Sequence, residues 1–550
     1  MDVDLHLRGG TIVDGTGAEP FRGDVLVDGD RIAAVIASEG QAPAPEIHAR
    51  QVIDATGLAI APGFIDIHSH SDWILPQRDH GAILRPLIEQ GITTIVTGNC
   101  GFSPAPIRPG HTDRLDESSD MLRDRPLAWD WSGVDGFFGC LESRGLSINV
   151  AHLAGHGSIR LSAMENPLGR PTPAERDTMR GLVREALEEG AVGLSTGLGY
   201  APGMFADLDE LADLAKVVAD RGRLFTSHLK AYSWISPFYP VNPFRWVDHN
   251  LRAVRDILGV AERSGARLQI SHLIFVGSRT WRTADTVIAE IERSKARGID
   301  VGFDCFPYTG GNTTIRVIYP AWAQEDLVEK LGRASVRARL RLEWRLLQWL
   351  LGIGFEHVQL LWAACPEYAR FEGMRFHRIA EELRTDPYSA YFRLTVASDA
   401  RARVMVHTYS GDAENEGPLR RVMAHPLNVF ETDTILVSRG AHNPASFGTF
   451  PRVLGRYVRE EKLFTLQEAV RKMTGAPAER LGLRDRGHMR EGQAADLVLF
   501  DPAGVGCDAD FDHPDIAPRG IETVIMNGKP VVSRGRFNGA AAGRVLRKVR

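Results

Sequence analysis

Eight apolar runs with the character of β-strands recur through the middle of the chain, and helical patterns lie between several of them. Amphipathic stretches such as residues 173–190 and 208–222 carry the helical pattern. Nearly continuous apolar strands that alternate with helices are typical of a parallel sheet. Eight such units predict an α/β fold, a TIM-type (β/α)8 barrel. The eight runs span residues 63–70, 93–100, 147–157, 191–200, 223–229, 267–273, 298–308 and 427–433.

The two ends of the chain follow a different pattern, in which short apolar runs alternate with polar residues around Gly-Gly, Asp-Gly and Asn-Gly turns. This pattern is typical of β-strands joined by tight turns. We therefore expect residues 1–60 and 485–550 to join into one small, discontinuous β-sandwich domain. Residues 61–484 are then expected to form the barrel.

The spacing between the last two runs is larger than one strand–helix unit requires, because about 118 residues separate Tyr308 from Leu427. The sequence between them contains an arginine-rich helical pattern. We expect a helical insertion between strands 7 and 8, at about residues 315–425. Its basic run is either a solvated helix face or part of a cap over the barrel mouth, and its functional role stays open.

Charge and composition exclude several classes of function. The formal net charge of the 550 residues is −5, which gives no electrostatic attraction toward nucleic acid or an anionic membrane. No signal peptide is visible at the start, and no uncharged apolar stretch reaches the ~20 residues of a membrane span. The five cysteines are odd in number and scattered, so we expect no disulfide framework and a cytoplasmic, reducing location.

Five candidate metal ligands lie at the ends of the apolar runs. His68 and His70 are two residues apart at the end of the first run, so they share one face of a strand. Cys100, His228 and His272 end the second, fifth and sixth runs. Each one alone is as easily a buried structural residue, but five at the same end of barrel strands indicate a metal site at the barrel mouth. A thiolate with imidazoles favours zinc over magnesium or calcium.

One carboxylate is placed to act beside such a metal. Asp433 ends the eighth run, and a carboxylate there can accept a proton from water and pass it to a leaving group. The alternative is a turn or capping aspartate. Asp399 is a weaker candidate because it lies inside the long insertion and in no barrel strand.

The sequence resembles the N-acyl-D-amino-acid deacylases, or D-aminoacylases, of the amidohydrolase superfamily. The resemblance rests on APGFIDIHSHSD, GITTIVTGNCGFSPAP, GLSTGLGYAPG and a C-terminal block that begins at GTFPRVLG. It covers nearly the whole chain, apart from parts of the 315–425 region. It implies zinc at the mouth of a barrel. Cys100, His228 and His272 would hold a tight zinc, and His68 and His70 would form a second, weaker site that shares Cys100.

The resemblance also implies roles for the remaining site residues. The family's catalytic aspartate falls on Asp433, and Tyr200 and Tyr308 resemble tyrosines that contact a substrate carboxylate. His156, in the GHGSIR segment, either stabilises an oxyanion or makes a structural hydrogen bond. A homo-oligomer is common among such relatives.

The substrate-binding residues depart from the family pattern. A lysine that helps bind the substrate carboxylate is replaced by Ile274, which cannot pair with an anion. Lys230 is a candidate replacement. The aromatic-rich segment 233–246 either lines a pocket for a neutral, amidated or bulkier substrate or packs as an ordinary loop.

These observations predict a zinc-dependent enzyme that hydrolyses the C–N amide bond of a small molecule, most simply an N-acyl-D-amino acid or a related N-acyl or amidated compound. A cyclic-amide hydrolase of the hydantoinase or dihydroorotase kind, and an ester or lactone hydrolase, stay open as alternatives. A non-catalytic barrel scaffold is disfavoured because such scaffolds lose their metal ligands, whereas this chain retains all five.

Overall fold

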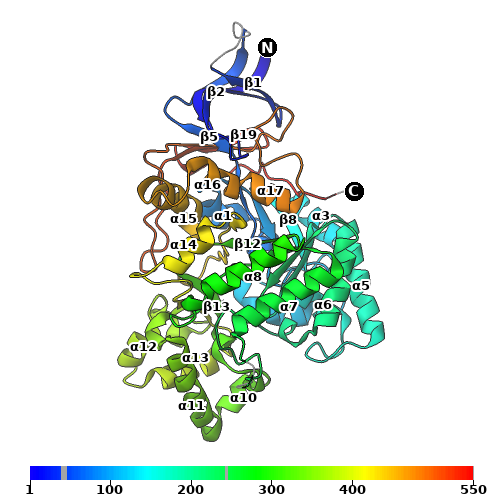
Figure 1. Cartoon of the computed structure of the whole chain (residues 1–550), viewed down its shortest axis with the longest axis vertical. Helices are drawn as coiled ribbons and strands as arrows, with labels where there is room; N and C mark the ends of the chain where they lie inside the picture. Colours follow the sequence, from blue (N-terminus) through cyan, green and yellow to red (C-terminus); the bar gives the residue numbers. More distant parts are fainter. Residues whose placement is uncertain (39–45, 242–243, 245, 549–550) are drawn as a thin grey trace.

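The computed structural model describes residues 1–38, 46–241, 244 and 246–548. Along the long axis of the molecule, a β-sheet built from both ends of the chain lies at one end, the barrel lies in the middle, and the insertion lies at the other end (Figure 1). No helix in the described part of the chain is long and apolar enough to cross a membrane.

The barrel contains eight parallel strands, and each strand coincides with one of the eight apolar runs, although β7 begins one residue earlier, at Ile92. Its two edge strands meet where the Asp433 N–H donates to the His68 carbonyl at 3.1 Å and the His70 N–H donates to the Thr434 carbonyl at 2.9 Å. The barrel is therefore nearly closed, and the predicted fold class is confirmed. In order around the barrel, the strands are β6 (Phe64–Asp66), β7 (Ile92–Thr97), β8 (Asn149–Gly155), β9 (Gly193–Gly197), β10 (Leu224–His228), β11 (Arg267–Ile270), β12 (Val301–Cys305) and β16 (Asn428–Phe430).

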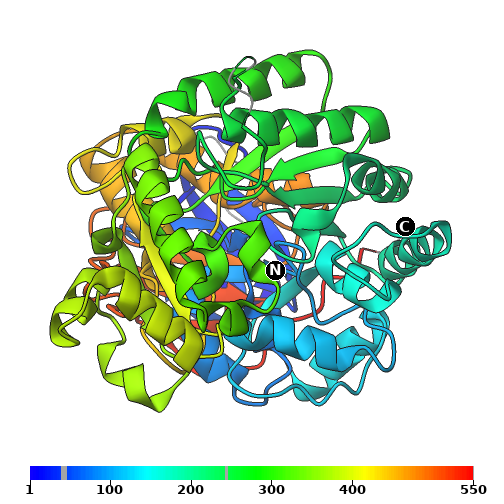
Figure 2. The ribbon, with the colours of Figure 1, turned by 90° about the horizontal axis from the view of Figure 1, so that it is seen from below.

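Helices surround the barrel on its outside, as the view from below shows (Figure 2). The two amphipathic stretches form α5 (Pro173–Glu188) and α6 (Leu208–Ala219). α5 begins with a capping box, in which Thr172 and Glu175 each bond the backbone N–H of the other, and such a box satisfies N–H groups that a helix leaves unpaired. Further helices of the barrel domain include α1 (His80–Ile88), α3 (Val134–Arg144), α7 (His249–Ser264), α8 (Ala284–Ala296) and α16 (Leu466–Met473).

The two ends of the chain share one mixed sheet. β5 (Ala59–Pro62) pairs antiparallel with β17 (Leu497–Phe500) and so joins the two halves. The Asn-Gly turn also forms, since Asn527 and Gly528 both have positive φ, 48° and 80°, as a tight hairpin turn requires. The other strands are β1 (Asp2–Ile12), β2 (Phe21–Asp28), β3 (Arg31–Ala37), β4 (His48–Asp54), β18 (Ile521–Met526), β19 (Lys529–Ser533) and β20 (Arg536–Phe537).

The insertion between β12 and β16 is not purely helical, which corrects the prediction. It carries a three-stranded antiparallel sheet of β13 (Gly310–Thr314), β15 (Arg403–His407) and β14 (Val358–Trp362). These strands are short and pair with segments far away in sequence, as where Gly310 lies opposite His407, so a local pattern does not reveal them. The larger helices are α11 (Ala334–Leu351), α12 (Phe376–Glu382) and α13 (Pro387–Ala397).

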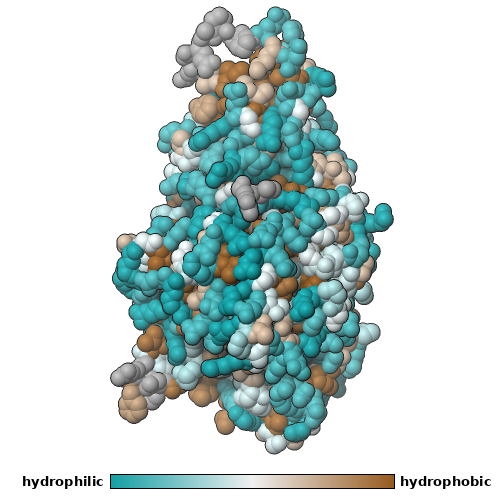
Figure 3. All heavy atoms as spheres, turned by 90° about the vertical axis from the view of Figure 1, so that its right-hand side faces the viewer, coloured by the Kyte–Doolittle hydropathy of each residue, from teal (hydrophilic) through white to brown (hydrophobic). Residues whose placement is uncertain are grey.

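The insertion has a hydrophobic core of its own, separate from that of the barrel. Trp344 of α11 is 2% exposed and packs against Tyr319, Tyr391 and Phe392. The surface shown in Figure 3 is mainly hydrophilic, with hydrophobic residues in small groups, as is ordinary for a folded protein.

Candidate metal centre

The five candidate metal ligands follow or end barrel strands. His68 and His70 follow β6, Cys100 follows β7, His228 ends β10 and His272 follows β11. The carboxyl ends of the strands share one rim of the barrel, where active sites of this fold lie. The fold therefore brings the donor atoms of these five residues together at that rim.

Three residues of the site have left-handed backbone conformations. φ is 52° at Cys100, 31° at His272 and 45° at Asp433, and such conformations cost roughly 1–3 kcal/mol each for residues other than glycine. The surrounding structure holds two of them in place, because the His272 N–H donates to Asp304 Oδ1 at 2.7 Å and the Asp433 N–H donates to the His68 carbonyl at 3.1 Å. Strain of this kind is typical of functional sites.

The donor atoms have spacings that fit zinc. Cys100 Sγ lies 3.7 Å from His228 Nδ1 and 3.4 Å from His272 Nε2, and these two nitrogens are 3.0 Å apart. Tetrahedral coordination with Zn–S and Zn–N bonds of about 2.3 and 2.0 Å separates sulfur and nitrogen ligands by roughly 3.5 Å. Cys100 also belongs to a second group with His68 and His70, in which Sγ lies 3.3 Å from His68 Nε2.

Asp433 faces the same cluster. Its Oδ1 lies 3.6 Å from His68 Nε2 and 3.5 Å from His70 Nε2. His68, His272 and Asp433 form a further group of converging donors. Asp399, by contrast, is exposed just beyond α13 and does not belong to these groups.

The electrostatics of the cluster favour ionised ligands. Burial opposes ionisation of Cys100, but the charges of His68 and His272 and hydrogen bonds from His228 and His272 hold the pKa of its thiol well below the ordinary value. Burial also acts to lower the pKa of His70, yet Asp433 and Cys100 raise it to about 9. Burial acts to raise the pKa of Asp433, but the hydrogen bond from His70 and the charge of His272 lower it. A thiolate and a carboxylate therefore face the imidazoles.

Two buried aspartates that the sequence analysis missed support the ligands from beneath. Asp304 accepts hydrogen bonds from the His272 N–H at 2.7 Å and from Gln269 Nε2 at 2.8 Å, and it lies 3.6 Å from His68 Nδ1. Asp66 accepts from Thr432 Oγ1 at 2.6 Å, and burial raises its pKa to about 7. Each aspartate interrupts an otherwise apolar strand, and a buried acid of this kind needs a buried partner. An acidic residue within an apolar run is therefore the sequence signal that predicts such a supporting residue.

Two of the four predicted substrate-binding residues line a cavity beside the cluster. Tyr200 donates to the Cys100 carbonyl at 2.7 Å, and its ring centroid lies 4.9 Å from that of His228. Lys230 donates to the Met204 carbonyl at 3.1 Å, and its pKa is lowered by burial.

The other two predicted residues are not among those that line this cavity. The Tyr308 ring is buried under the guanidinium of Arg452, 4.6 Å from it. His156 Nε2 lies 2.7 Å from Glu210 Oε1, and the same carboxylate pairs with Arg160. These contacts agree with a structural hydrogen bond for His156, the second of its two proposed roles.

The cavity has a volume of about 210 Å³. His228, His272 and Asp433 lie in its wall, and the rest is mainly apolar. Ile274 lines it at 8% exposure, where the resemblance leads one to expect a lysine. From the segment 233–246, Ile235 and Phe238 line it, whereas residues 242, 243 and 245 lie outside the described residues.

Tyr409 is a further cavity residue that the sequence analysis missed. Its neighbours Thr408 and Ser410 both have positive φ, 71° and 57°. Its ring packs on Gly311, where an added Cβ would lie 2.5 Å from the ring. Tyr409 and Asp433 line the same cavity, and burial together with the charge of Asp433 raises the pKa of the phenol.

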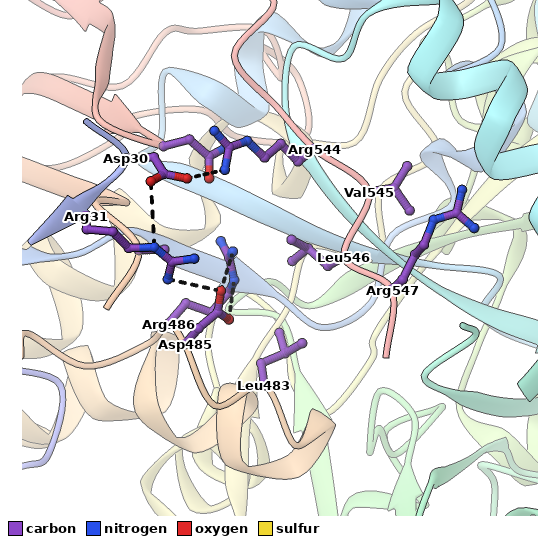
Figure 4. Close-up of a pocket in the computed structure, with 11 residues that line it drawn as sticks. Asp30, Arg31, Leu483, Asp485, Arg486, Arg544, Val545, Leu546 and Arg547 are labelled. Atoms are coloured by element: carbon purple, nitrogen blue, oxygen red, sulfur yellow. Dashed lines mark hydrogen bonds and ion pairs between the residues drawn. The ribbon is translucent and has the colours of Figure 1, made fainter. Parts of the chain in front are cut away.

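A second cavity, of about 310 Å³, lies where the C-terminal segment crosses between the terminal sheet and the barrel. Its guanidinium groups are already paired, as Figure 4 shows: Arg544 with Asp30, Arg31 with Asp30 and Asp485, and Arg486 with Asp485. Paired arginines offer little to an anionic ligand, so this cavity is a structural junction.

Comparison with known proteins agrees with the fold and the cluster. Residues 51–532 match the model of the amidohydrolase family. The chain is 35% identical to the N-acyl-D-glutamate deacylase of Alcaligenes xylosoxydans xylosoxydans over 549 residues, which is 99% of this chain and 97% of the relative.

Two solved structures are similar over essentially the whole chain. The N-acyl-D-glutamate deacylase of Bordetella bronchiseptica, complexed with zinc and a phosphonate inhibitor, has a TM-score of 0.79 at 33% identity and covers 100% of both chains. A D-aminoacylase with a binuclear metal centre has a TM-score of 0.79 at 30% identity and covers 99% of this chain and 100% of its own.

The fold, the cluster and these matches define the class: the chain is an amidohydrolase with a candidate His/Cys metal site. Within that class it belongs to the D-aminoacylase, or N-acyl-D-amino-acid deacylase, family.

Proposed function

We propose that this protein is a zinc-dependent hydrolase that deacylates an N-acyl-D-amino acid or a related N-acyl or amidated compound. The observation that carries the proposal is the convergence of Cys100 with four imidazoles and Asp433 at the carboxyl rim of the barrel. The relatives that are N-acyl-D-amino-acid deacylases support the substrate class.

Cys100, His228 and His272 would hold the tight zinc, and His68 and His70 would form a weaker site that shares Cys100. The thiolate and imidazole donors are the set that zinc prefers. When bound, zinc supplies Lewis-acid chemistry, which polarises a carbonyl group and makes a water molecule more acidic.

Asp433 is the proposed proton carrier. Its ionised carboxylate accepts the proton of the attacking water, whose oxygen bonds to the carbonyl carbon. The same proton then passes to the nitrogen as the C–N bond breaks, so the products are a carboxylic acid and a free amine. The Asp433 N–H donates to the His68 carbonyl, which fixes the backbone that carries this carboxylate.

Lys230 is the proposed partner for a substrate carboxylate. Lys230 lines the cavity two residues after His228. Its ammonium donates to the Met204 carbonyl, and Asp256 acts on it only through charge, without an ion pair among the described residues. A half-buried cation without a directly contacting carboxylate favours an anionic ligand. Tyr200 lines the cavity on the same side as His228, and we propose that it also contacts the substrate. The positions of Tyr308 and His156 do not support such a role for them.

The test measures zinc content and hydrolysis together. Purified wild-type protein should contain zinc and hydrolyse members of a panel of N-acyl-D-amino acids, their L-enantiomers, their amides, a hydantoin and a lactone. Cys100→Ala should lose both zinc and activity. Cys305→Ala is the matched control, because Cys305 is also buried, at the end of the barrel strand β12, and belongs to no donor group among the described residues.

Asp433→Asn separates metal binding from proton transfer. We expect it to retain tight zinc and to lower kcat by roughly 10²–10⁴-fold, the usual contribution of a general acid–base residue. A wild-type protein that purifies without zinc and hydrolyses no compound of the panel after zinc addition would contradict the proposal. Turnover of only the hydantoin or only the lactone would favour the cyclic-amide or ester alternatives.

A further inference from the structure

The cavity beside the metal centre continues into the insertion, and the insertion supplies much of its wall. α11 contributes Trp344, Leu347, Gln348 and Leu351. The spacing i, i+3, i+4, i+7 places these four side chains on one face of the helix. The opposite wall begins at Ile274, two residues after His272.

The wall from the insertion carries no charge and is mainly apolar, with polar groups from Asn312, Thr313 and Gln348. The arginines of α11 lie away from it: Arg339 pairs with Glu343, and Arg341 pairs with Asp386. The Oε1 of Gln348 already accepts a hydrogen bond from Tyr388 at 2.7 Å. A charged group in this part of the cavity would lose its hydration without finding a counter-ion, because the Asn312 amide is the unpaired polar group that the insertion offers there.

The apolar wall is also long. Trp344 and Leu351 are seven residues apart on α11, and a rise of 1.5 Å per residue places them about 10 Å apart along the helix. An extended chain of about three residues spans the same length. The wall is therefore longer than one ordinary amino-acid side chain needs.

From this wall we infer that the substrate carries an extended, uncharged apolar group that occupies the chamber between the barrel rim and α11. The substrate is then an N-acyl compound with a long aliphatic or aromatic substituent. This class differs from the acidic N-acyl-D-glutamate that the 35%-identical relative is named for. The inference rests on the proposed function, because it names the substrate of that same site.

The apolar group can belong to the acyl side or to the amine side, and two series of substrates distinguish them. In the first, the acyl chain of N-acyl-D-leucine grows from acetyl to dodecanoyl. In the second, the acyl group stays acetyl and the amine side grows from glycine through D-norleucine to D-2-aminodecanoic acid. Each buried methylene is expected to raise kcat/KM roughly fourfold in one of the two series, and N-acetyl-D-glutamate should be a poor substrate.

A pair of neighbouring leucines on α11 provides the variant and its control. Leu347 lines the chamber, whereas Leu346 is 57% exposed. Leu347→Trp should fill the chamber and shift the preferred chain to a shorter one, and Leu347→Ala should shift it to a longer one. Leu346→Trp should leave the preference unchanged. The alanine variant keeps the test valid if the tryptophan variant does not fold.

A binding measurement gives a readout that does not need the metal. Calorimetric titration of zinc-stripped protein with N-acyl-D-leucines should show affinity that rises with chain length and a negative heat-capacity change, and Leu347→Trp should weaken binding of the longest chain. Hydrolysis of short substrates with a flat length dependence in both series would overturn the inference and leave the proposed function intact. Length-dependent binding without hydrolysis of any substrate would support the chamber and overturn the proposed function.

Discussion

Replacing Glu210 with glutamine tests whether His156 belongs to a structural ion cluster. Glu210 Oε1 lies 2.7 Å from His156 Nε2 and 2.6 Å from Arg160 Nη1, and all three side chains are at most 1% exposed. Burial acts to raise the pKa of Glu210, but His156 and Arg160 lower it to about 2. The gap from the ordinary value of 4.5 corresponds to about 3 kcal/mol at neutral pH.

The sign of the pH dependence follows from this lowered pKa. As the pH falls from about 4.5 toward 2, the unfolded chain takes up the Glu210 proton before the folded protein does, so the folded protein loses this stabilisation. The stabilisation is fully present above pH 4.5. Glu210→Gln should therefore lower the free energy of unfolding by about 3 kcal/mol at pH 7 and flatten its decrease over that acidic range.

Urea unfolding of wild type and variant, between pH 7 and pH 3, measures both effects. Glu367→Gln is the control, because Glu367 is exposed and such changes usually stay within about 0.5 kcal/mol. Equal stability of Glu210→Gln and wild type at pH 7 would refute the cluster as a source of stability. A His156→Gln variant that keeps its stability and zinc but loses activity would instead support the alternative role of His156, in which it stabilises an oxyanion.

Three further substitutions test individual contacts. Tyr409→Phe removes a hydroxyl beside the cavity and should lower kcat/KM up to about 10-fold without changing zinc content; unchanged kinetics would remove Tyr409 from the site. Gly448→Ala places a Cβ 2.6 Å from the Tyr308 hydroxyl. It should lower the free energy of unfolding by about 1–3 kcal/mol through overpacking, measured as a lower Tm. An unchanged Tm would mean that the tyrosine moves freely. Gly199→Ala places a Cβ 2.6 Å from His228 Nε2. It should lower zinc retention against a weak chelator, while the Tm of the zinc-free protein stays close to that of the wild type. Full zinc retention would show that this imidazole has room to shift.

The barrel could be predicted because its signal is local. Each strand is buried on both faces, so it must be an apolar run, and each covering helix must be amphipathic. The turn at Asn527 and Gly528 was equally readable, since few residue pairs adopt two left-handed conformations in succession.

The sheet of the insertion could not be predicted in this way. β13 has the sequence GGNTT, which resembles a loop, and it becomes a strand only because β15, about 90 residues later, pairs with it. Pairing between distant segments depends on the packing of everything between them, and no local periodicity reports it.

The substrate-binding residues show the same limit. Tyr200 and Lys230 line the cavity, but Tyr308 turns toward Arg452 and His156 turns toward Glu210. Sequence position places each residue near the carboxyl end of a strand. The direction of each side chain depends on which buried charge or ring is available to it.

The sequence by itself determined the fold class and pointed to the candidate donors, because the carboxyl ends of barrel strands converge at one rim and only a few residue types bind zinc. Tertiary structure alone decided the distances between those donors, the buried aspartates beneath them and the apolar chamber beyond Ile274. Each of these depends on side chains from segments far apart in sequence, and only the closed barrel and the folded insertion bring such segments into contact.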